Sequence, residues 1–204
     1  MNLHTGCCWA FAAVSAMEGR VQISTGKLVS LSEQQIVDCD VNGDDHGCDG
    51  GLPINAFKFI IENGGLTSED RYPYQGEQGT CDNSVTPVAS ISGYEPVPQN
   101  DEQSLMQAVA NQPVAVGIYA SPVFKSYHGG IFIGPCEVNE INDLNHAVTV
   151  VGYGTDSDTG LNYWLLKNQW GTLWGEAGYM RMQKDVGDPK GLCGIAMMPV
   201  YPTA

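Results

Sequence analysis

The apolar positions of this chain change their spacing about halfway along it. In the first part, an apolar side chain recurs every three or four residues from Cys8 until Gly26. The positions concerned are Phe11, Val14, Met17 and Val21. Such spacing gives a helix one apolar face, and glycine is a common helix stop. We therefore expect a long, buried helix that begins near Cys8 and ends at Gly26.

Two further helices are expected before the spacing changes. The first begins after Ser32, whose side chain can cap the helix. The Gln35 side chain can in turn bond the Ser32 backbone N–H, which would complete a capping box. The second begins at Pro53, since proline suits the first helical position, and it ends at Gly64–Gly65. Residues 42–51 between these helices are polar and rich in glycine, so we expect a loop there.

The second part of the chain has the pattern of a β domain. Turn residues dominate from residue 64 to about residue 100, and we place the domain boundary near Pro96. Asp101 then caps one short helix. Short β-branched and aromatic runs follow at 114–119, 147–151, 163–166, 179–182 and 195–200. The expected fold class is α+β, with a mainly helical domain over residues 1–96 and a mainly β domain over residues 97–204.

Composition restricts the classes of partner. The chain has 204 residues, 43% of them apolar, and a formal net charge of -14. Nucleic acids and anionic membranes reward clustered cations, so neither is expected as a partner. No run of about 18 apolar residues is present, and Met1–His4 lacks the features of a signal peptide. We expect a soluble chain that is a fragment of a longer one.

The seven cysteines are scattered along the chain, at positions 7, 8, 39, 48, 81, 136 and 193. A zinc site would need closely spaced ligand pairs, but no C-x-x-C pair occurs and the four histidines are also scattered. We therefore expect disulfides and no metal. Disulfides in turn indicate an oxidising compartment, such as a vacuole, a lysosome or the outside of the cell.

One of these cysteines has a second interpretation. Cys8 stands where the first predicted helix begins, and the unpaired N–H groups and the helix dipole there favour a thiolate. A lone cysteine is more often buried or bridged, so this position alone indicates little. A nucleophilic thiolate also needs a base.

His146 and Asn168 supply the other two parts of a thiol catalyst. His146 begins an apolar strand that would hold its imidazole rigidly, although a solitary histidine there is more often structural. Asn168 can accept a hydrogen bond from the imidazole and fix its tautomer, while Trp170 excludes water. The three residues together predict a Cys-His-Asn site.

At these residues the chain resembles the papain family of cysteine proteases. The matching motifs cover almost its whole length: they are Cys8-Trp9-Ala10-Phe11, Leu31-Ser32-Glu33-Gln34, Gly47-Cys48-Asp49-Gly50-Gly51, Asn145-His146-Ala147-Val148, Gly152-Tyr153-Gly154 and Trp170-Gly171-Thr172-Leu173-Trp174-Gly175-Glu176. The double cysteine and the closing Tyr201–Ala204 resemble plant senescence-type members. The resemblance implies a helical left lobe and an antiparallel, barrel-like β right lobe, with a substrate cleft between them.

The implied activity is that of a cysteine endopeptidase without metal or organic cofactor. Backbone groups at Gly50 and Gly51 would pair with an extended substrate. An apolar pocket would favour Leu, Val or Phe two residues before the scissile bond; the positions implied for it are Leu52, Pro53, Gly117, Leu144, Ala147 and Met198. Implied partners are peptide and protein substrates and inhibitors of the cystatin type. A monomer in the secretory pathway, in a vacuole, a lysosome or outside the cell, is expected.

The cysteine pairs are also taken from the family pattern. It implies the disulfides Cys39–Cys81 and Cys136–Cys193. Thr5 stands where the family has the cysteine that bridges to Cys48, so we expect Cys48 to lack a partner. Cys7 would be a packed thiol that forms no bridge.

Two further departures affect the site itself. Asn2 stands where the family has a glutamine that, with the Cys8 backbone N–H, holds the oxyanion. Losing one such donor lowers turnover by about 10²- to 10³-fold. The first alternative function is therefore a catalytically impaired homologue that acts as a binding or regulatory protein. A second is another thiol acyl-transferase that uses a cysteine, a histidine and a polar third residue. Gln169 replaces the serine usual before Trp170, and the sequence offers no physical account of its effect. We attribute the changes within Met1–Thr5 to a misplaced start or a truncation.

Overall fold

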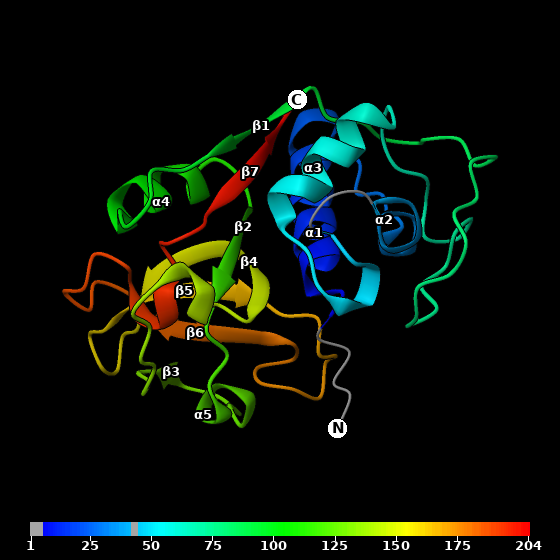
Figure 1. The fold of residues 1–204 in the computed structure, drawn as a ribbon. Helices are drawn as coiled ribbons and strands as arrows, with labels where there is room; N and C mark the ends of the chain where they lie inside the picture. The colour runs from blue at the N-terminus through cyan, green and yellow to red at the C-terminus, as the bar shows by residue number, and fades with distance from the viewer. Residues whose placement is uncertain (1–5, 42–44) are drawn as a thin grey trace. The chain divides into compact units, whose positions relative to one another are not determined.

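The computed structural model describes residues 6–41 and 45–204, and the chain divides into two compact units (Figure 1). Unit 1 comprises Met1–Glu95 together with Val200–Ala204, and unit 2 comprises Pro96–Pro199. The boundary therefore lies within one residue of the position expected near Pro96. The last five residues differ from the expectation, because they join the first unit instead of the second.

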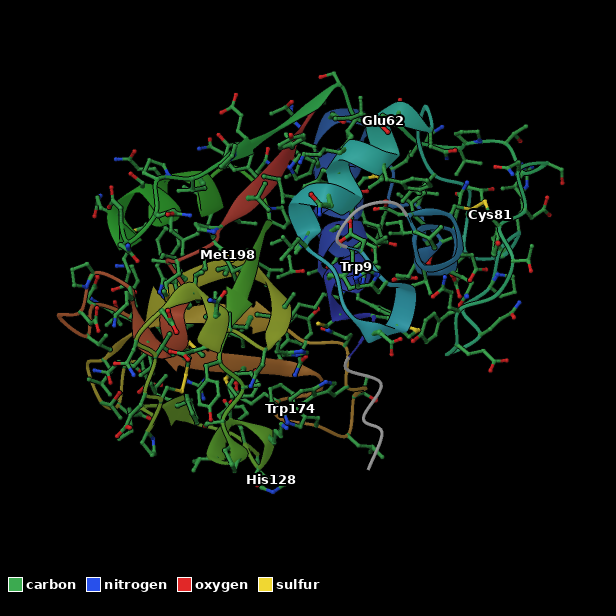
Figure 2. The ribbon with its side chains drawn as sticks, in the orientation of Figure 1. Trp9, Glu62, Cys81, His128, Trp174 and Met198 are labelled. Atoms are coloured by element: carbon green, nitrogen blue, oxygen red, sulfur yellow. A yellow bond between two sulfur atoms is a disulfide. The ribbon has the colours of Figure 1, made fainter. Side chains whose placement is uncertain are left out.

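Unit 1 is built on the helices α1 (Cys8–Thr25), α2 (Glu33–Cys39) and α3 (Pro53–Glu62), with the 3₁₀ turn η1 (Gly47–Asp49) between α2 and α3. The long first helix is confirmed, and it ends at Gly26, whose φ of 74° favours glycine. The buried side chains of α1, including Trp9, lie in the interior of this unit (Figure 2). The sequence pattern therefore located the main helix of unit 1.

The start of α2 follows the expected pattern only in part. Ser32 Oγ accepts a hydrogen bond from the Gln35 backbone N–H at 3.0 Å, as a cap should. The predicted return bond from Gln35 is wrong, because its side-chain Oε1 accepts from the Thr67 N–H at 2.9 Å. Gln35 is buried, so its side chain satisfies a backbone donor from another segment instead of closing its own helix end.

The end of the chain returns to unit 1 as a strand. The short strands β1 (Gly93–Pro96) and β7 (Val200–Thr203) are neighbours, and β7 contacts both α1 and α3 (Figure 1). The Tyr201 hydroxyl donates to Glu95 at 2.7 Å. The strand expected at 195–200 is wrong, since residues 195–198 form turns and bends after the 3₁₀ turn η3 (Leu192–Gly194), and strand structure begins only at Val200. This pairing explains why Val200–Ala204 belongs to unit 1.

Unit 2 contains a mostly antiparallel sheet with the strand order β2-β4-β5-β6-β3. The strands are β2 (Val114–Ile118), β3 (Ile131–Phe132), β4 (His146–Thr155), β5 (Asn162–Lys167) and β6 (Tyr179–Gln183). Only β3 pairs in parallel, with β6. Buried and more exposed residues alternate along β5 and β6, as a sheet with one buried face requires. The helices of unit 1 and this sheet together fit the expected α+β class.

The remaining elements of unit 2 are short. Asp101 caps α4 (Glu102–Val109) as expected, accepting from Gln103 N and Ser104 N. The elements α5 (Pro122–Lys125) and η2 (Ile141–Asp143) were not predicted, because four or fewer residues show no periodicity. In the part of the chain that the structure describes, no helix has the length and apolar character needed to cross a membrane.

Candidate active site

The candidate nucleophile lies on the first turn of α1. Cys8 is the first residue of this helix and is buried. The backbone N–H groups of Ala10 and Phe11 both donate to the Cys7 carbonyl, at 3.0 and 3.3 Å. The Trp9 indole N–H donates to the Gly47 carbonyl at 2.9 Å, which fixes the start of α1 to η1. A rigid helix start that carries a thiol is therefore present, as the sequence indicates.

The disulfides correct one expectation. Cys39–Cys81 and Cys136–Cys193 are confirmed, but Cys48 pairs with Cys7 instead of lacking a partner. Gly6 allows this pairing, because a Cβ at that residue would overlap the Cys48 backbone carbonyl. The chain can therefore approach closely enough for Cys7 to form the bridge. Cys8 is the one cysteine outside the three disulfides, all seven being within the described residues.

The segment expected to bind substrate backbone lies directly before α3. Gly50 has a φ of 132°, which favours glycine, and its carbonyl accepts from the His46 N–H at 2.8 Å. A Cβ on Gly51 would collide with the Trp9 ring, so a side chain is excluded there as well. The Leu52 N–H donates to Asp45 Oδ1 at 2.9 Å. Asp45 thus holds this segment in place, a role that the sequence did not reveal.

Unit 1 contains two buried acids that affect one another, Asp40 and Asp45. Asp45 is 1% exposed and Asp40, at the end of α2, is 8% exposed. Asp40 Oδ2 accepts no hydrogen bond from the described residues. Burial, and then the like charges of Asp45 and of Glu62 at the end of α3, raise the pKa of Asp40 to about 7. Asp40 therefore remains protonated in the folded protein at acidic pH.

Replacing Asp40 with asparagine is expected to stabilise the protein more at pH 8 than at pH 5. The folded carboxyl keeps its proton up to about pH 7, whereas an unfolded one ionises above its ordinary value of 3.8, so stability falls as pH rises between the two. Asparagine has no charge to bury, so we expect a gain of roughly 1 to 2 kcal/mol at pH 8. Urea unfolding at both pH values measures it, with the exposed Asp70→Asn as control. An equal gain at pH 5 and pH 8 would contradict this assignment.

Unit 2 brings His146 and Asn168 together. His146 is the first residue of β4 and is 4% exposed. Its Nε2 lies 2.9 Å from Asn168 Oδ1, just beyond the end of β5. An amide oxygen only accepts, so Nε2 carries the hydrogen in this contact and Nδ1 is the atom left to exchange a proton. The backbone N–H of Asn168 donates to the Gly178 carbonyl at 3.0 Å, which holds the amide in position.

Aromatic rings surround the imidazole within unit 2. Trp170 stacks on His146 with a centroid distance of 4.7 Å and an interplanar angle of 25°. Phe124 packs edge-on against Trp170 at 5.7 Å and lies 5.5 Å from Trp174, which Figure 2 labels. Burial lowers the pKa of His146 to about 4. The hydrogen bond to Asn168 raises this pKa, and the positive charge of Lys125 lowers it further, but both effects are smaller than that of burial. The imidazole by itself is therefore neutral at neutral pH.

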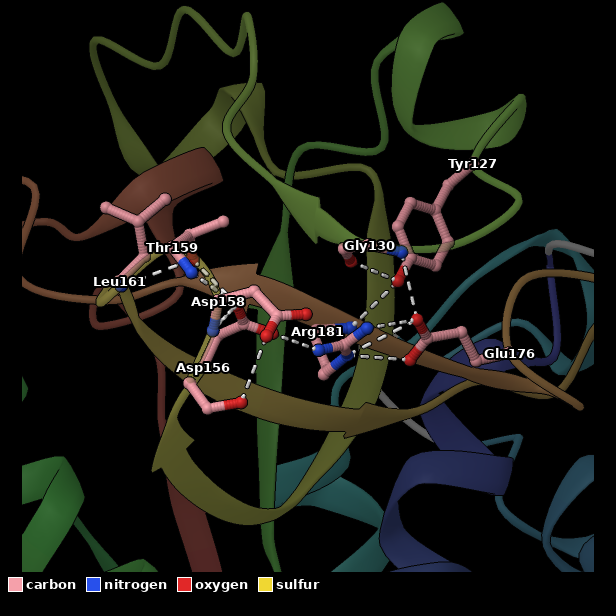
Figure 3. Close-up of polar contacts among 9 residues, drawn as sticks. Tyr127, Gly130, Asp156, Asp158, Thr159, Leu161, Glu176 and Arg181 are labelled. Atoms are coloured by element: carbon pink, nitrogen blue, oxygen red, sulfur yellow. Dashed lines mark hydrogen bonds and ion pairs between the residues drawn. The ribbon is translucent and has the colours of Figure 1, made fainter.

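A polar network supports the loop that follows Trp170 (Figure 3). Arg181 on β6 donates to both oxygens of Glu176 and, at 2.7 Å, to Asp156. Glu176 also accepts from the Gly130 N–H at 2.9 Å, while the Tyr127 hydroxyl donates to the Gly130 carbonyl. The Arg181 guanidinium holds the pKa of Glu176 below its usual value. These contacts fix the far end of the loop that carries the aromatic rings.

The residues expected to line the substrate pocket fall in both units. Within unit 2, Gly117 and Ala147 are cross-strand partners on β2 and β4. A Cβ at Gly117 would lie 3.1 Å from Leu144 and 3.8 Å from Met198, so these four positions are gathered together. Leu52 is partly exposed in unit 1 and Pro53 opens α3 there. Asn2, expected at the oxyanion hole, lies outside the described residues.

No metal centre is indicated by the described residues. Residues 6–41 and 45–204 contain no group of three or more His, Cys, Asp or Glu side chains that could hold a metal ion. The candidate groups are a thiol in unit 1, at Cys8, and an imidazole and an amide in unit 2, at His146 and Asn168.

Sequence reasoning missed the residues that fix the segments near the candidate groups. Asp45, Glu176 and Arg181 act through hydrogen bonds to distant segments, and no local pattern predicts such partners. Glu176 belongs to the Trp170–Glu176 motif, which was the one available signal. Gln169 also has a specific partner, since its side-chain amide donates to the Ala147 carbonyl at 3.1 Å.

Comparison with known proteins gives consistent matches over the whole chain. The family described as "Papain family cysteine protease" matches residues 2–203. Senescence-specific cysteine protease SAG39 of Oryza sativa subsp. japonica is 58% identical over 200 residues, covering 98% of this chain and 58% of the relative. Senescence-specific cysteine protease SAG12 of Arabidopsis thaliana is 57% identical over 201 residues, covering 97% and 56%. The chain thus spans little more than half the length of these curated relatives.

Solved structures agree in fold. The bromelain protease from Ananas comosus in complex with the E64 inhibitor matches with a TM-score of 0.91 and 48% identity, covering 98% of this chain and 89% of that one. The proform of the Amb a 11 cysteine protease, a ragweed pollen allergen, matches with a TM-score of 0.90 and 46% identity, covering 98% and 59%. The expected papain-like α+β fold is thereby confirmed.

Proposed function

The chain belongs to the papain family of cysteine proteases, and on this premise we propose that it hydrolyses peptide bonds with Cys8 as nucleophile and His146 as proton partner. The observation that supports this most strongly is the geometry around His146. Its Nε2 is held by Asn168 at 2.9 Å and its ring is stacked on Trp170. This arrangement fixes the tautomer and leaves Nδ1 for proton exchange, as a thiol protease needs.

The proposed reaction has two steps. The Cys8 thiolate attacks the scissile carbonyl, and the His146 imidazolium gives its proton to the leaving amine as the peptide bond breaks. Water then attacks the thioester carbonyl while neutral His146 takes a proton from the water. The bond between the carbonyl carbon and the Cys8 sulfur breaks, which releases the acid product and restores the thiolate and the imidazolium. Asn168 orients the imidazole and exchanges no proton. No metal or organic cofactor takes part.

The thiolate and imidazolium depend on one another in this proposal. Burial alone lowers the pKa of His146 to about 4, so the ring needs a nearby negative charge to hold a proton at neutral pH. A thiolate at Cys8 would supply that charge. The Cys8 backbone N–H and the side chain of Asn2 are the proposed donors to the oxyanion.

Substrate would bind along Gly50 and Gly51 as an extended chain. A Cβ at Gly50 would meet no atom within 4 Å, so this position offers open space beside the backbone. The apolar group formed by Gly117, Leu144, Ala147 and Met198 would receive the side chain two residues before the scissile bond; Leu52 and Pro53 complete the set on unit 1. Small and apolar walls favour Leu, Val or Phe over Arg at this substrate position.

Fluorogenic peptides test both the activity and this preference. With Arg at the cleavage site and Leu, Phe or Arg one position before it, kcat/KM is expected to be about 10- to 100-fold higher for Leu and Phe than for Arg. The assays should be run under mildly acidic, reducing conditions. Peptide binding without turnover would instead favour the alternative function, an impaired homologue that binds peptides.

Location and partners follow from the same proposal. The three disulfides fit an oxidising compartment, and we propose the secretory pathway, with a vacuole, a lysosome or the cell exterior as destination. Peptides and proteins are the proposed substrates, cystatin-type proteins the proposed inhibitors, and a monomer the proposed state. The net charge of -14 argues against nucleic acid or an anionic membrane surface as a partner.

A further inference from the structure

Gln169 lies where β5 ends and the chain turns away from β4. The antiparallel register pairs Thr149 with Lys167, and continuing it by two residues places Gln169 opposite Ala147. The backbone N–H of Gln169 does not continue the β5–β4 hydrogen bonds to Ala147, because it donates to Asn168 Oδ1 at 2.9 Å instead. The Ala147 carbonyl receives the Gln169 side-chain amide at 3.1 Å. The side chain thus extends the ladder by one hydrogen bond beyond the end of the strand.

The backbone of Gln169 also affects how the Asn168 amide is oriented. Asn168 Oδ1 contacts two donors, the Gln169 N–H and His146 Nε2, whereas Asn168 Nδ2 has no hydrogen-bond partner among the described residues. Rotating the amide by 180° would point its NH₂ group at both donors and lose both hydrogen bonds. The Gln169 N–H therefore fixes which atom of Asn168 faces the imidazole.

We infer that Gln169 is a positioning residue for the Asn168–His146 pair, acting through a closed ring of contacts. The ring runs from Ala147 to the Gln169 side chain, through the Gln169 N–H to Asn168 Oδ1, and through His146 back to Ala147, its neighbour on β4. Serine, the residue usual at this position, is too short to reach the Ala147 carbonyl from the same backbone. This inference rests on the proposed function and adds to it a residue that orients the Asn168 amide and, through it, the His146 imidazole.

The deciding variant is Gln169→Glu, which keeps the shape of the side chain and removes its donor. At pH 7 a carboxylate cannot donate to the Ala147 carbonyl and repels it, so kcat/KM should fall by about tenfold, mainly through kcat. At lower pH the protonated carboxyl can donate again, so the ratio of variant to wild-type activity should rise toward one. Gln169→Ser should lose about three- to tenfold at every pH. A merely structural role would not give the recovery at low pH.

The matched control is Gln107→Glu, the same change on an exposed position of α4 in the same unit. It should leave kcat/KM unchanged throughout the pH range. If Gln169→Glu behaves like this control, or if its activity ratio is flat with pH, the inference is overturned. Gln169→Ser keeps the test decisive should the glutamate variant fail to fold.

A second measurement separates this inference from the proposed function. NMR of the protein without substrate can follow the proton on His146 Nε2. This proton should exchange with solvent about three- to tenfold faster in Gln169→Glu at pH 7 than in wild type. This readout needs no turnover. If the wild-type protein has no peptidase activity but Gln169→Glu still exchanges faster than wild type, only the proposed function is contradicted. If the exchange rate is the same in both proteins, the positioning role of Gln169 is contradicted.

Discussion

Under the proposed mechanism, the Cys8→Ser variant is expected to lose peptide hydrolysis by roughly 10⁴-fold or more in kcat/KM, because an imidazole that is a weak base cannot ionise a serine hydroxyl. Burial lowers the pKa of His146 to about 4, so this ring cannot draw a proton from an alcohol at neutral pH. A thiol is far more acidic than an alcohol and can form the ion pair. The expected loss therefore follows from the same burial that protects the site from water.

His146 offers a direct check of that reasoning. In Cys8→Ser the negative sulfur is gone, so the imidazole should be neutral down to about pH 4, and NMR should show no titration between pH 5 and pH 8. Because unfolded histidine binds a proton below about 6.5, this variant should also lose stability as pH falls from there toward 4. A ring that titrates near 6.5 in the folded variant would contradict the burial argument.

Covalent labelling supplies the control for the same variant. Cys8 is the one cysteine outside the three disulfides, so a thiol-directed epoxide should add once to the intact wild-type chain. The adduct should be missing from Cys8→Ser. Ser24→Ala, an exposed change on the same helix, should keep both labelling and turnover. Labelling of Cys8→Ser at the wild-type rate would show that another thiol is the reactive one.

Removing the Cys7–Cys48 disulfide with the double variant Cys7→Ser/Cys48→Ser is expected to cost about 2 to 4 kcal/mol in the free energy of unfolding. The bond closes a sequence separation of 41 residues and restricts the unfolded chain accordingly. It also ties the start of α1, where Cys8 lies, to η1, which directly precedes Gly50. Activity should therefore fall further than the fraction of folded protein does.

The matched control is the double variant Cys39→Ser/Cys81→Ser. Its bond spans a nearly equal separation of 42 residues, so chain entropy predicts a similar loss in urea unfolding. It joins the end of α2 to a later loop and does not hold the start of α1, so the activity per folded molecule should change less. Two reactive thiols at Cys7 and Cys48 in unreduced, denatured wild type would show that the pairing itself is wrong.

Local sequence patterns located the elements and the chemical groups of the site. The apolar spacing before Gly26, the proline at Pro53 and the β-branched and aromatic runs in β5 and β6 are each local features, so α1, α3 and these strands could be predicted from the sequence. Motif resemblance likewise singled out Cys8, His146 and Asn168 as the candidate catalytic residues. The short strands β1 and β3 carry too few residues for any period, and they were missed.

What the sequence determined by itself is the fold class, the starts of the helices α1 to α4, the end of α1, and the residue types available for chemistry. Tertiary structure decided which of two adjacent cysteines bridges to Cys48, where the Gln35 amide goes, and how Gln169 and Asp45 hold the site. The reason is physical: periodicity and capping depend on neighbours along the chain, whereas a buried polar group takes whichever partner the folded chain brings within reach, often tens of residues away.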